Sequence, residues 1–300
     1  MSKLIARALI AVPTLFLLAS ISGCPGAGNP PTPGKLNLAI TDTPVDSADK
    51  VVVAFKGVVL MSPDGQQDYQ FATERSIDLL TLQGNASAML LNGVGVIAGD
   101  YQWMRLDVDE ANSYLVSSTG GRFPLFVPSG SESGLKLVSG FTVAQGSTAD
   151  FVIDFDLRNS LTLDNHGGTT TYTLKPALRL INLQQAGSVS GTLASTLSIG
   201  GAPITATACA PAVYVYSGSG VIPEGYSVLL TGGTAPLASA KASLDNTVGD
   251  YKYTVGFLAP GTYTLAVTCA MADTAGATTL AFSTSQPATV TANTTTAIDF

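Results

Sequence analysis

The stretch Ala149-Asp150-Phe151-Val152-Ile153-Asp154-Phe155-Asp156-Leu157 alternates two sets of side chains. Successive side chains of a β-strand point to opposite faces of its sheet, so this alternation predicts a strand with one buried face. The buried face would carry Phe151, Ile153, Phe155 and Leu157, and the opposite face Asp150, Val152, Asp154 and Asp156. Such a half-buried strand is typical of a sandwich of antiparallel sheets.

A second strand, residues 101–109, shows the same alternation. One face would carry Met104, Leu106 and Val108, and the other Tyr101, Trp103, Arg105, Asp107 and Asp109. Further short strands are expected at 36–41, 51–61, 113–116 and 171–183, with Gly-, Pro-, Asn- and Asp-rich turns between the elements. Residues 77–82 fit either a short helix or a strand. Only 12% of the 300 residues are charged and 31 are Gly, which is typical of a β-rich extracellular protein.

Five short motifs resemble the family called domain of unknown function 4382: residues 38–46 (LAITDTPVD), 77–80 (IDLL), 99–106 (GDYQWMRL), 154–156 (DFD) and 174–176 (LKP). The resemblance covers about residues 36–183. It implies an all-β domain of secreted and lipid-anchored prokaryotic proteins. It implies no activity, so no catalytic residue is carried over from it.

A second domain is expected at residues 188–300, because charged residues become sparse after residue 184. Its clearest feature is the stretch 255–265, in which Pro260-Gly261 makes a tight turn between two strands. This stretch resembles the carboxypeptidase regulatory-like, transthyretin-type sandwich. The predicted fold class is therefore all-β, with two tandem antiparallel β-sandwich domains, Ig-like or transthyretin-like, after a cleaved lipoprotein signal peptide.

The N-terminus has the layout of a secretory signal. Lys3 and Arg7 precede an apolar run, and Ile21-Ser22-Gly23-Cys24 follows it. That tetrapeptide resembles the lipobox of bacterial lipoproteins, which implies cleavage after residue 23, palmitate-type acylation of Cys24 and a membrane anchor. An uncleaved transmembrane helix is disfavoured, because the run is shorter than about 20 residues and contains Pro13. Residues 24–35 would form a Pro/Gly-rich tether. Pro25, where Asp would resemble an inner-membrane retention signal, favours the outer membrane of a bacterial cell envelope.

Two further cysteines, Cys209 and Cys269, remain in a compartment that permits disulfides. Cys269 shares its strand face with Tyr263, Leu265 and Val267, so its sulfur should point inward. A disulfide closing a loop of about 60 residues would contribute roughly 4 kcal/mol. The alternative is a pair of buried free thiols.

Several functions find no support in the sequence. The net charge is −7, and −9 without Lys3 and Arg7, which disfavours nucleic acid as a partner. The only histidine, His166, lies in a turn-like context, so a catalytic triad and a zinc site both lack residues. No phosphate-binding glycine loop is present. We therefore expect a protein that is not an enzyme.

Carboxylates are the first candidate site. Asp107 and Asp109 share one strand face and Asp154 and Asp156 share another, so neighbouring strands would bring four like charges together. Calcium is the cation that such oxygen ligands suit, and no other cofactor is expected. The alternative is that both faces are solvated and paired with Arg105 and Arg158.

Aromatic residues are the second candidate. Tyr101, Trp103 and Arg105 would lie on a polar strand face, where flat rings beside hydrogen-bonding groups suit sugar stacking. The alternative is that the rings pack on a neighbouring strand or on the second domain. The sequence thus predicts a lipid-anchored envelope protein with a non-catalytic binding or structural role, whose partner is a polysaccharide or an envelope protein. The alternative function is a carbohydrate-binding surface module, with or without calcium.

Overall fold

The structure is a computed structural model that describes residues 32–43, 48–62, 64–128, 134–166, 168–175, 177–205, 209–226, 234–269 and 280–300. The predicted signal peptide, the acylation site Cys24 and most of the predicted tether lie outside these residues. Residues 31–300 form one compact unit. Within the described ranges, the structure has no helix that is both long and apolar enough to cross a membrane.

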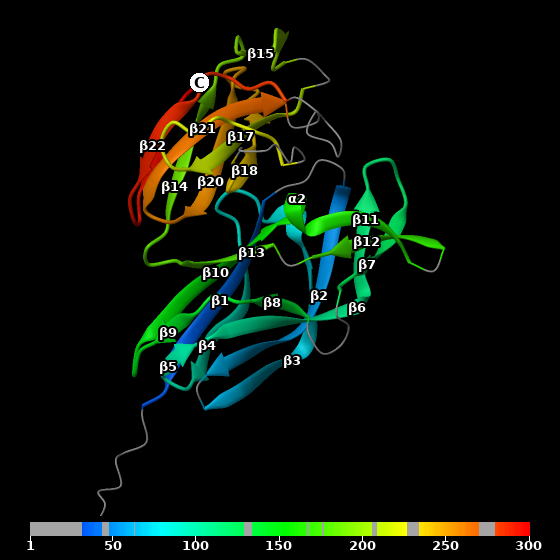
Figure 1. Cartoon of the computed structure of the whole chain (residues 1–300), viewed down its shortest axis with the longest axis vertical. Helices are drawn as coiled ribbons and strands as arrows, with labels where there is room; N and C mark the ends of the chain where they lie inside the picture. Colours follow the sequence, from blue (N-terminus) through cyan, green and yellow to red (C-terminus); the bar gives the residue numbers. More distant parts are fainter. Residues whose placement is uncertain are drawn as a thin grey trace, which may run out of the picture. The chain divides into compact units, whose positions relative to one another are not determined.

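Residues 34–182 form two main sheets (Figure 1). The four-stranded sheet has the order β13-β10-β1-β4, with β1 (Gly34–Thr43), β4 (Ala88–Val96), β10 (Thr148–Asp156) and β13 (Leu178–Asn182). The seven-stranded sheet has the order β11-β12-β7-β6-β2-β3, and β8 also pairs with β6. Its strands are β2 (Ala48–Ser62), β3 (Gly65–Asp78), β6 (Trp103–Ser117), β7 (Arg122–Phe126), β8 (Leu135–Leu137), β11 (Leu161–His166) and β12 (Thr169–Leu174).

Short elements complete this part. β5 (Gly99–Tyr101) and β9 (Phe141–Val143) form a two-stranded sheet. A 3-10 turn, η1 (Leu79–Thr81), follows the end of β3, so residues 77–82 combine a strand end with a helical turn. A four-residue helix, α2 (Leu157–Ser160), follows β10. His166, which was expected in a turn, is the last residue of β11 and is paired with Thr169.

The alternation in residues 149–157 gives the strand it predicts. Phe151, Ile153 and Phe155 are buried in the core that the first two sheets share. The Phe155 ring meets Phe55 of β2 edge to face, with ring centroids 6.3 Å apart. A fully buried side chain of this size contributes about 1.5–3 kcal/mol, so this face of β10 is a main source of stability.

The sequence led us to expect antiparallel sheets, but the structure also contains parallel pairs. β10 runs parallel to β1 with Lys35 opposite Thr148, β12 runs parallel to β7, and β14 (Gly187–Leu193) runs parallel to β23 (Thr295–Ala297). A parallel pair needs a long crossover between its strands. Between β1 and β10, the chain supplies β2 to β9 as that crossover.

Residues 187–300 form two four-stranded sheets with a core of their own. One has the order β19-β20-β14-β23, from β14 (Gly187–Leu193), β19 (Ser243–Leu244), β20 (Tyr251–Leu258) and β23 (Thr295–Ala297). The other has the order β18-β17-β21-β22, from β17 (Pro211–Ser217), β18 (Ala238–Lys241), β21 (Gly261–Cys269) and β22 (Gln286–Val290). β15 (Ser198–Ile199) and β16 (Ala202–Pro203) form a separate hairpin.

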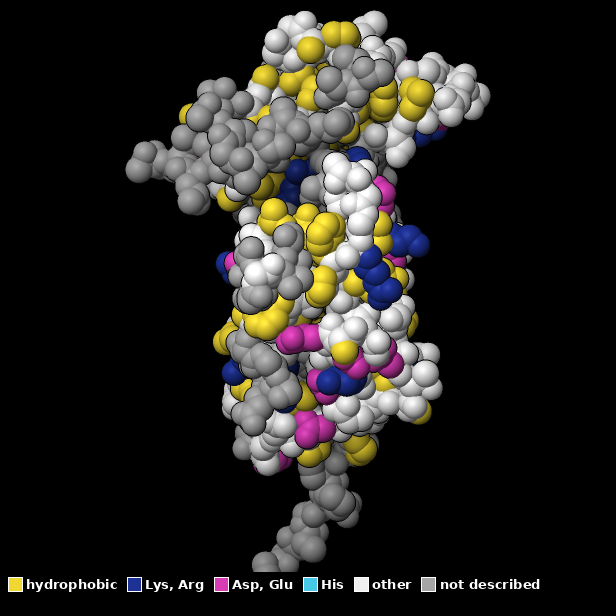
Figure 2. All heavy atoms as spheres, turned by 90° about the vertical axis from the view of Figure 1, so that its right-hand side faces the viewer, with side chains coloured by type: hydrophobic (Ala, Val, Ile, Leu, Met, Phe, Trp, Pro, Cys, Tyr) yellow, Lys and Arg dark blue, Asp and Glu magenta, His cyan; other side chains and the backbone are white. Residues whose placement is uncertain are grey.

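The all-β fold class is confirmed, and so is the disulfide. Cys209 and Cys269 are joined, with their Cα atoms 4.7 Å apart. Tyr263, Leu265 and Val267 lie in the core beside Cys269, as the strand alternation predicted. Figure 2 shows charged side chains over the part that β1 to β13 form and few over the rest, in line with the drop in charge after residue 184. The two domain boundaries and the transthyretin-type assignment stay predictions.

Candidate functional site

β6 places Trp103 on an exposed sheet face. Residues 103–108 alternate between half-buried and buried positions, so Trp103, Arg105 and Asp107 point away from the core. On the next strand, Lys136 of β8 lies opposite Arg105, and its ammonium nitrogen is 4.2 Å from the centre of the Trp103 ring. We call Trp103, Arg105, Asp107 and Lys136 the Trp103 face. A cation above an indole ring is a favourable pair worth about 0.5–1 kcal/mol at an exposed site.

The prediction that Tyr101 belongs to this face is wrong. Tyr101 is only 2% exposed, and its ring stacks on Phe141 with centroids 4.8 Å apart. Its hydroxyl donates to the carbonyl oxygen of Ile97. The alternation fails because Tyr101 ends β5, which pairs with β9, whereas Trp103 begins β6 in the large sheet. The alternation of side chains between the two faces therefore does not continue through Gln102.

The two acidic pairs do not meet. Asp107 and Asp109 lie on β6 of the seven-stranded sheet, whereas Asp154 and Asp156 lie on β10 of the four-stranded sheet. Asp107 is 3.7 Å from the Lys56 ammonium, and Asp109 accepts a hydrogen bond from the Ala111 backbone. Across the described residues, no group of three or more His, Cys, Asp or Glu side chains is placed to hold a metal ion. The four-carboxylate calcium site is thus wrong.

The expectation that Asp154 and Asp156 are solvated is also wrong. Their exposed fractions are 4% and 8%. Asp154 forms an ion pair with Arg179 of β13. Asp156 caps α2 by accepting hydrogen bonds from the backbone and the side-chain amide of Asn159, at 3.2 and 2.6 Å. Burial raises the pKa of Asp156 to about 6, although the bonds from Asn159 act in the opposite direction.

Residues 238–257 cover this second face of β10. Val152 packs with Phe257, Ala39 and Ile181 in a small apolar cluster. A Cβ atom on Gly256 would lie 2.4 Å from the Gly84 carbonyl oxygen, so β20 approaches the 84–85 backbone too closely for any other residue. The Arg158 guanidinium, which was expected to pair with a carboxylate on a solvated face, lies 5.8 Å from the Tyr214 ring and 5.6 Å from the Tyr226 ring.

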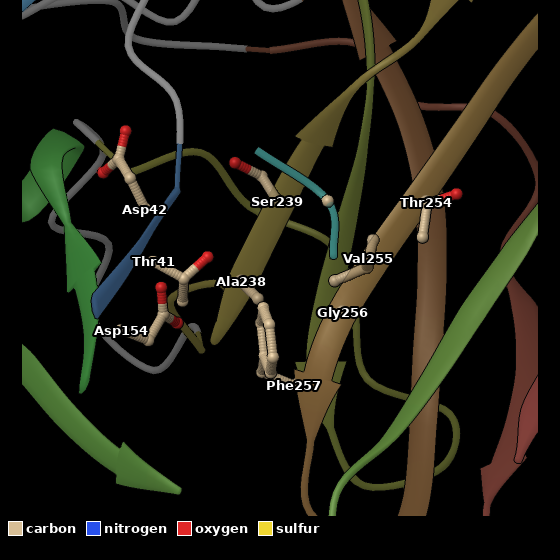
Figure 3. Close-up of a pocket in the computed structure, with 10 residues that line it drawn as sticks. Thr41, Asp42, Asp154, Ala238, Ser239, Thr254, Val255, Gly256 and Phe257 are labelled. Carbon is tan, nitrogen blue, oxygen red and sulfur yellow. The ribbon is translucent and has the colours of Figure 1, made fainter. Parts of the chain in front are cut away.

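A small polar pocket lies at this junction (Figure 3). Thr41, Asp42 and Asp154 line one side of it, and Ser239 and Phe257 line the other. Its volume is about 10 Å³, which is close to the least that one water molecule needs. The pocket is therefore part of the packing where β1 and β10 meet β18 and β20, and it is too small for a substrate.

Arg179 and Phe257 were not expected to have a role, although the sequence carries a signal for Arg179. It lies in the apolar run Ala177-Leu178-Arg179-Leu180-Ile181, and a cation in such a run requires a buried partner. Phe257 had no such signal, because it adopts a positive φ of 53° within β20 and leaves the alternation of its strand.

Known proteins resemble parts of this chain. The family described as domain of unknown function (DUF4382) matches residues 33–176. No curated protein matches. A leucine-rich repeat protein from Bacteroides thetaiotaomicron is 15% identical, with 90% of this chain and 26% of that chain covered and a TM-score of 0.24. This chain thus spans about a quarter of the length of that protein.

Two other solved structures are matched over most of their own length. A minor pilin of Streptococcus agalactiae is 9% identical, with 88% of this chain and 94% of that chain covered and a TM-score of 0.19. A candidate cell adhesion protein from Bacteroides fragilis is 10% identical, with 89% and 92% covered and a TM-score of 0.21. At these TM-scores, none of the three structures carries an argument about function.

Proposed function

We propose that this chain, whose residues 33–176 belong to the family of domain of unknown function 4382, is a lipid-anchored protein of the bacterial cell envelope with a non-catalytic binding or structural role. The observation that best supports a non-catalytic role is that the buried acids bond other residues of the fold. Asp154 and Asp156, the carboxylates best shielded from water among the predicted site residues, are held by Arg179 and Asn159 and serve the fold.

The geometry of these acids also favours a non-catalytic role. A carboxylate that acts as a general acid or nucleophile must reach a substrate in a cleft. The pocket beside Asp154 has room for about one water molecule. Asp154 and Asp156 instead hold β10 to β13 and to α2, so their role is structural.

The membrane anchor rests on the lipobox-like tetrapeptide at residues 21–24. Expression of the full chain in a Gram-negative host with an alkyne-tagged palmitate should label the protein, and Cys24→Ala should remove the label and shift the protein to the soluble fraction. Unchanged labelling of the Cys24→Ala variant would refute the anchor. Sucrose-gradient separation of the two membranes tests the proposed outer-membrane location.

A carbohydrate-binding role is the second candidate, and the Trp103 face supports it. Trp103 and Arg105 point away from the core, and Lys136 supplies a second cationic group beside the indole. This proposed site excludes Tyr101, which is buried, and it includes no calcium ion, because the predicted carboxylates lie on two different sheets. In affinity electrophoresis through gels containing alginate, xylan or glucan, Trp103→Ala should lose any retardation and Trp103→Phe should keep part of it. Equal retardation of all three proteins would exclude this face.

A further inference from the structure

A groove of about 400 Å³ lies between β9 and β13, beside the turn at Ala259-Pro260. Small-ligand sites usually enclose about 300–1,000 Å³, so this volume is in their range. The pocket beside Asp154, at about 10 Å³, is far below it. None of the residues that line the groove belongs to the Trp103 face.

Aromatic and aliphatic side chains form a firm floor for the groove. Phe141, Phe151 and Ile181 line it and are each 7% exposed. The Phe141 ring is fixed on both sides, because it stacks on Tyr101 and meets Phe151 edge to face at 5.3 Å. A floor held in this way is already formed before a ligand arrives, which lowers the entropic cost of binding.

The groove also presents hydrogen-bonding groups that carry no charge. Ser139, Asn182 and Gln185 line it. The Asn182 side-chain oxygen accepts a hydrogen bond from the Gln184 backbone at 2.9 Å, which orients the amide. No other described residue bonds the Asn182 amide, so both Nδ2 hydrogens are available to a ligand. Among the residues that the structure describes, none that lines the groove has an ionisable side chain, although the whole chain has 35 of Asp, Glu, Lys and Arg.

We infer that this groove binds a neutral oligosaccharide, a ligand class that rests on the binding role proposed above. A charged ligand would be desolvated there without a counter-charge, which is unfavourable. A neutral sugar would lay an apolar C–H face along the accessible edge of this floor and its hydroxyls against amide and hydroxyl groups. Asn182 and Gln185 supply those groups on one wall, and Ser139 supplies one on the other.

The test measures binding of defined neutral probes to the full chain in detergent micelles. Isothermal titration with cellotetraose, maltotetraose, xylotetraose and mannotetraose should reveal binding of at least one sugar. Ala259→Trp should weaken that binding at least tenfold, because the indole would fill the mouth of the groove. The fold should persist, since Ala259 is exposed and Tyr263 bonds only its backbone oxygen. Gln185→Ala, which removes one ligand contact, should weaken binding less.

Val248→Trp is the matched control, because it adds the same indole at an exposed position outside both the groove and the Trp103 face, and it should bind as the unmodified chain does. Loss of binding in Trp103→Ala with full binding in Ala259→Trp would overturn the groove and leave the proposed binding role intact. Absence of binding to all four tetrasaccharides would overturn the inference. So would a groove-dependent signal from the uncharged hexapeptide Thr-Val-Thr-Val-Thr-Val without a signal from any sugar, because the groove would then be a peptide site.

Discussion

β6 and β10 carry the same sequence pattern, and their polar faces meet different surroundings. On β6, Trp103, Arg105 and Asp107 remain half-exposed beside Lys136. On β10, Asp154 and Asp156 are buried, and residues that follow Asp154 by some 80 to 100 positions line the pocket beside it. The difference lies in Val152, which has no counterpart among the outward residues of β6. One aliphatic side chain between acids marks a face that another part of the chain covers.

The largest effect should come from breaking the buried ion pair. Arg179→Ala leaves Asp154 in place without its arginine, and such a loss costs about 3 kcal/mol. Urea unfolding of Arg179→Ala and of Arg105→Ala measures the contrast between the two faces. Arg105→Ala should lower the free energy of unfolding by less than about 1 kcal/mol. Equal losses would mean that the two faces do not differ.

The next largest effect should be on the pH dependence of stability, which should differ between the buried acids of β10 and the half-exposed acids of β6. The pKa of Asp156 is about 6 in the fold and 3.8 as an ordinary carboxyl, so the folded state binds the proton more tightly. Its contribution is thus fully present below about pH 3.8 and is lost, by about 2–3 kcal/mol in all, as the pH rises through about 6. Unfolding curves between pH 4 and 7 should show this fall, and Asp156→Asn should remove it.

Asp109→Asn is the control for that titration, because Asp109 lies on the exposed strand. It should keep the pH profile of the unmodified chain. A profile that is flat before any substitution would contradict the burial of Asp156.

A smaller effect should follow from crowding the junction. Gly256→Ala adds a Cβ atom 2.4 Å from two oxygens, of Gly84 and Asn85, and should cost about 1–3 kcal/mol as the strands separate. Gly261→Ala is the matched control, since its Cβ would meet nothing closer than 3.7 Å. Thermal unfolding should place only the Gly256→Ala midpoint clearly below that of the unmodified chain.

The smallest effect should be on the Trp103 face. Lys136→Ala removes the cation above the indole and should change the unfolding free energy by less than about 1 kcal/mol. Trp103 is the only tryptophan, so the emission maximum reports this contact directly. A shifted maximum with an unchanged midpoint is the expected result. An unchanged spectrum would show that Lys136 does not lie above the ring in solution.

Local periodicity predicted the strands and which side chains share a face. It placed Phe151, Ile153 and Phe155 in one core and pointed the sulfur of Cys269 toward the other. It could not predict what covers the second face of β10, because that depends on where residues 238–257 fold. It misplaced Tyr101 because the chain passes from one sheet to another at Gln102, which leaves no mark on hydrophobicity.

The β9–β13 groove illustrates the same limit. Its lining comes from four stretches, around residues 141, 151, 181 and 260, and none of them was predicted to bind a ligand. Only the tertiary arrangement brings the turn that carries Asn182 and Gln185 beside the two phenylalanine rings.

The parallel pairing of β1 with β10 has a consequence for folding. Asn37 donates a hydrogen bond to Asp150 across a sequence separation of 113 residues, so one edge of the first strand is paired only after β10 has been made. Chains with such distant contacts fold slowly. During synthesis, β1 emerges long before β10, so the edge of β1 that pairs with β10 stays open until residues 148–156 have been made. An unpaired strand edge can pair with a wrong strand, so this edge is a point of risk for misfolding.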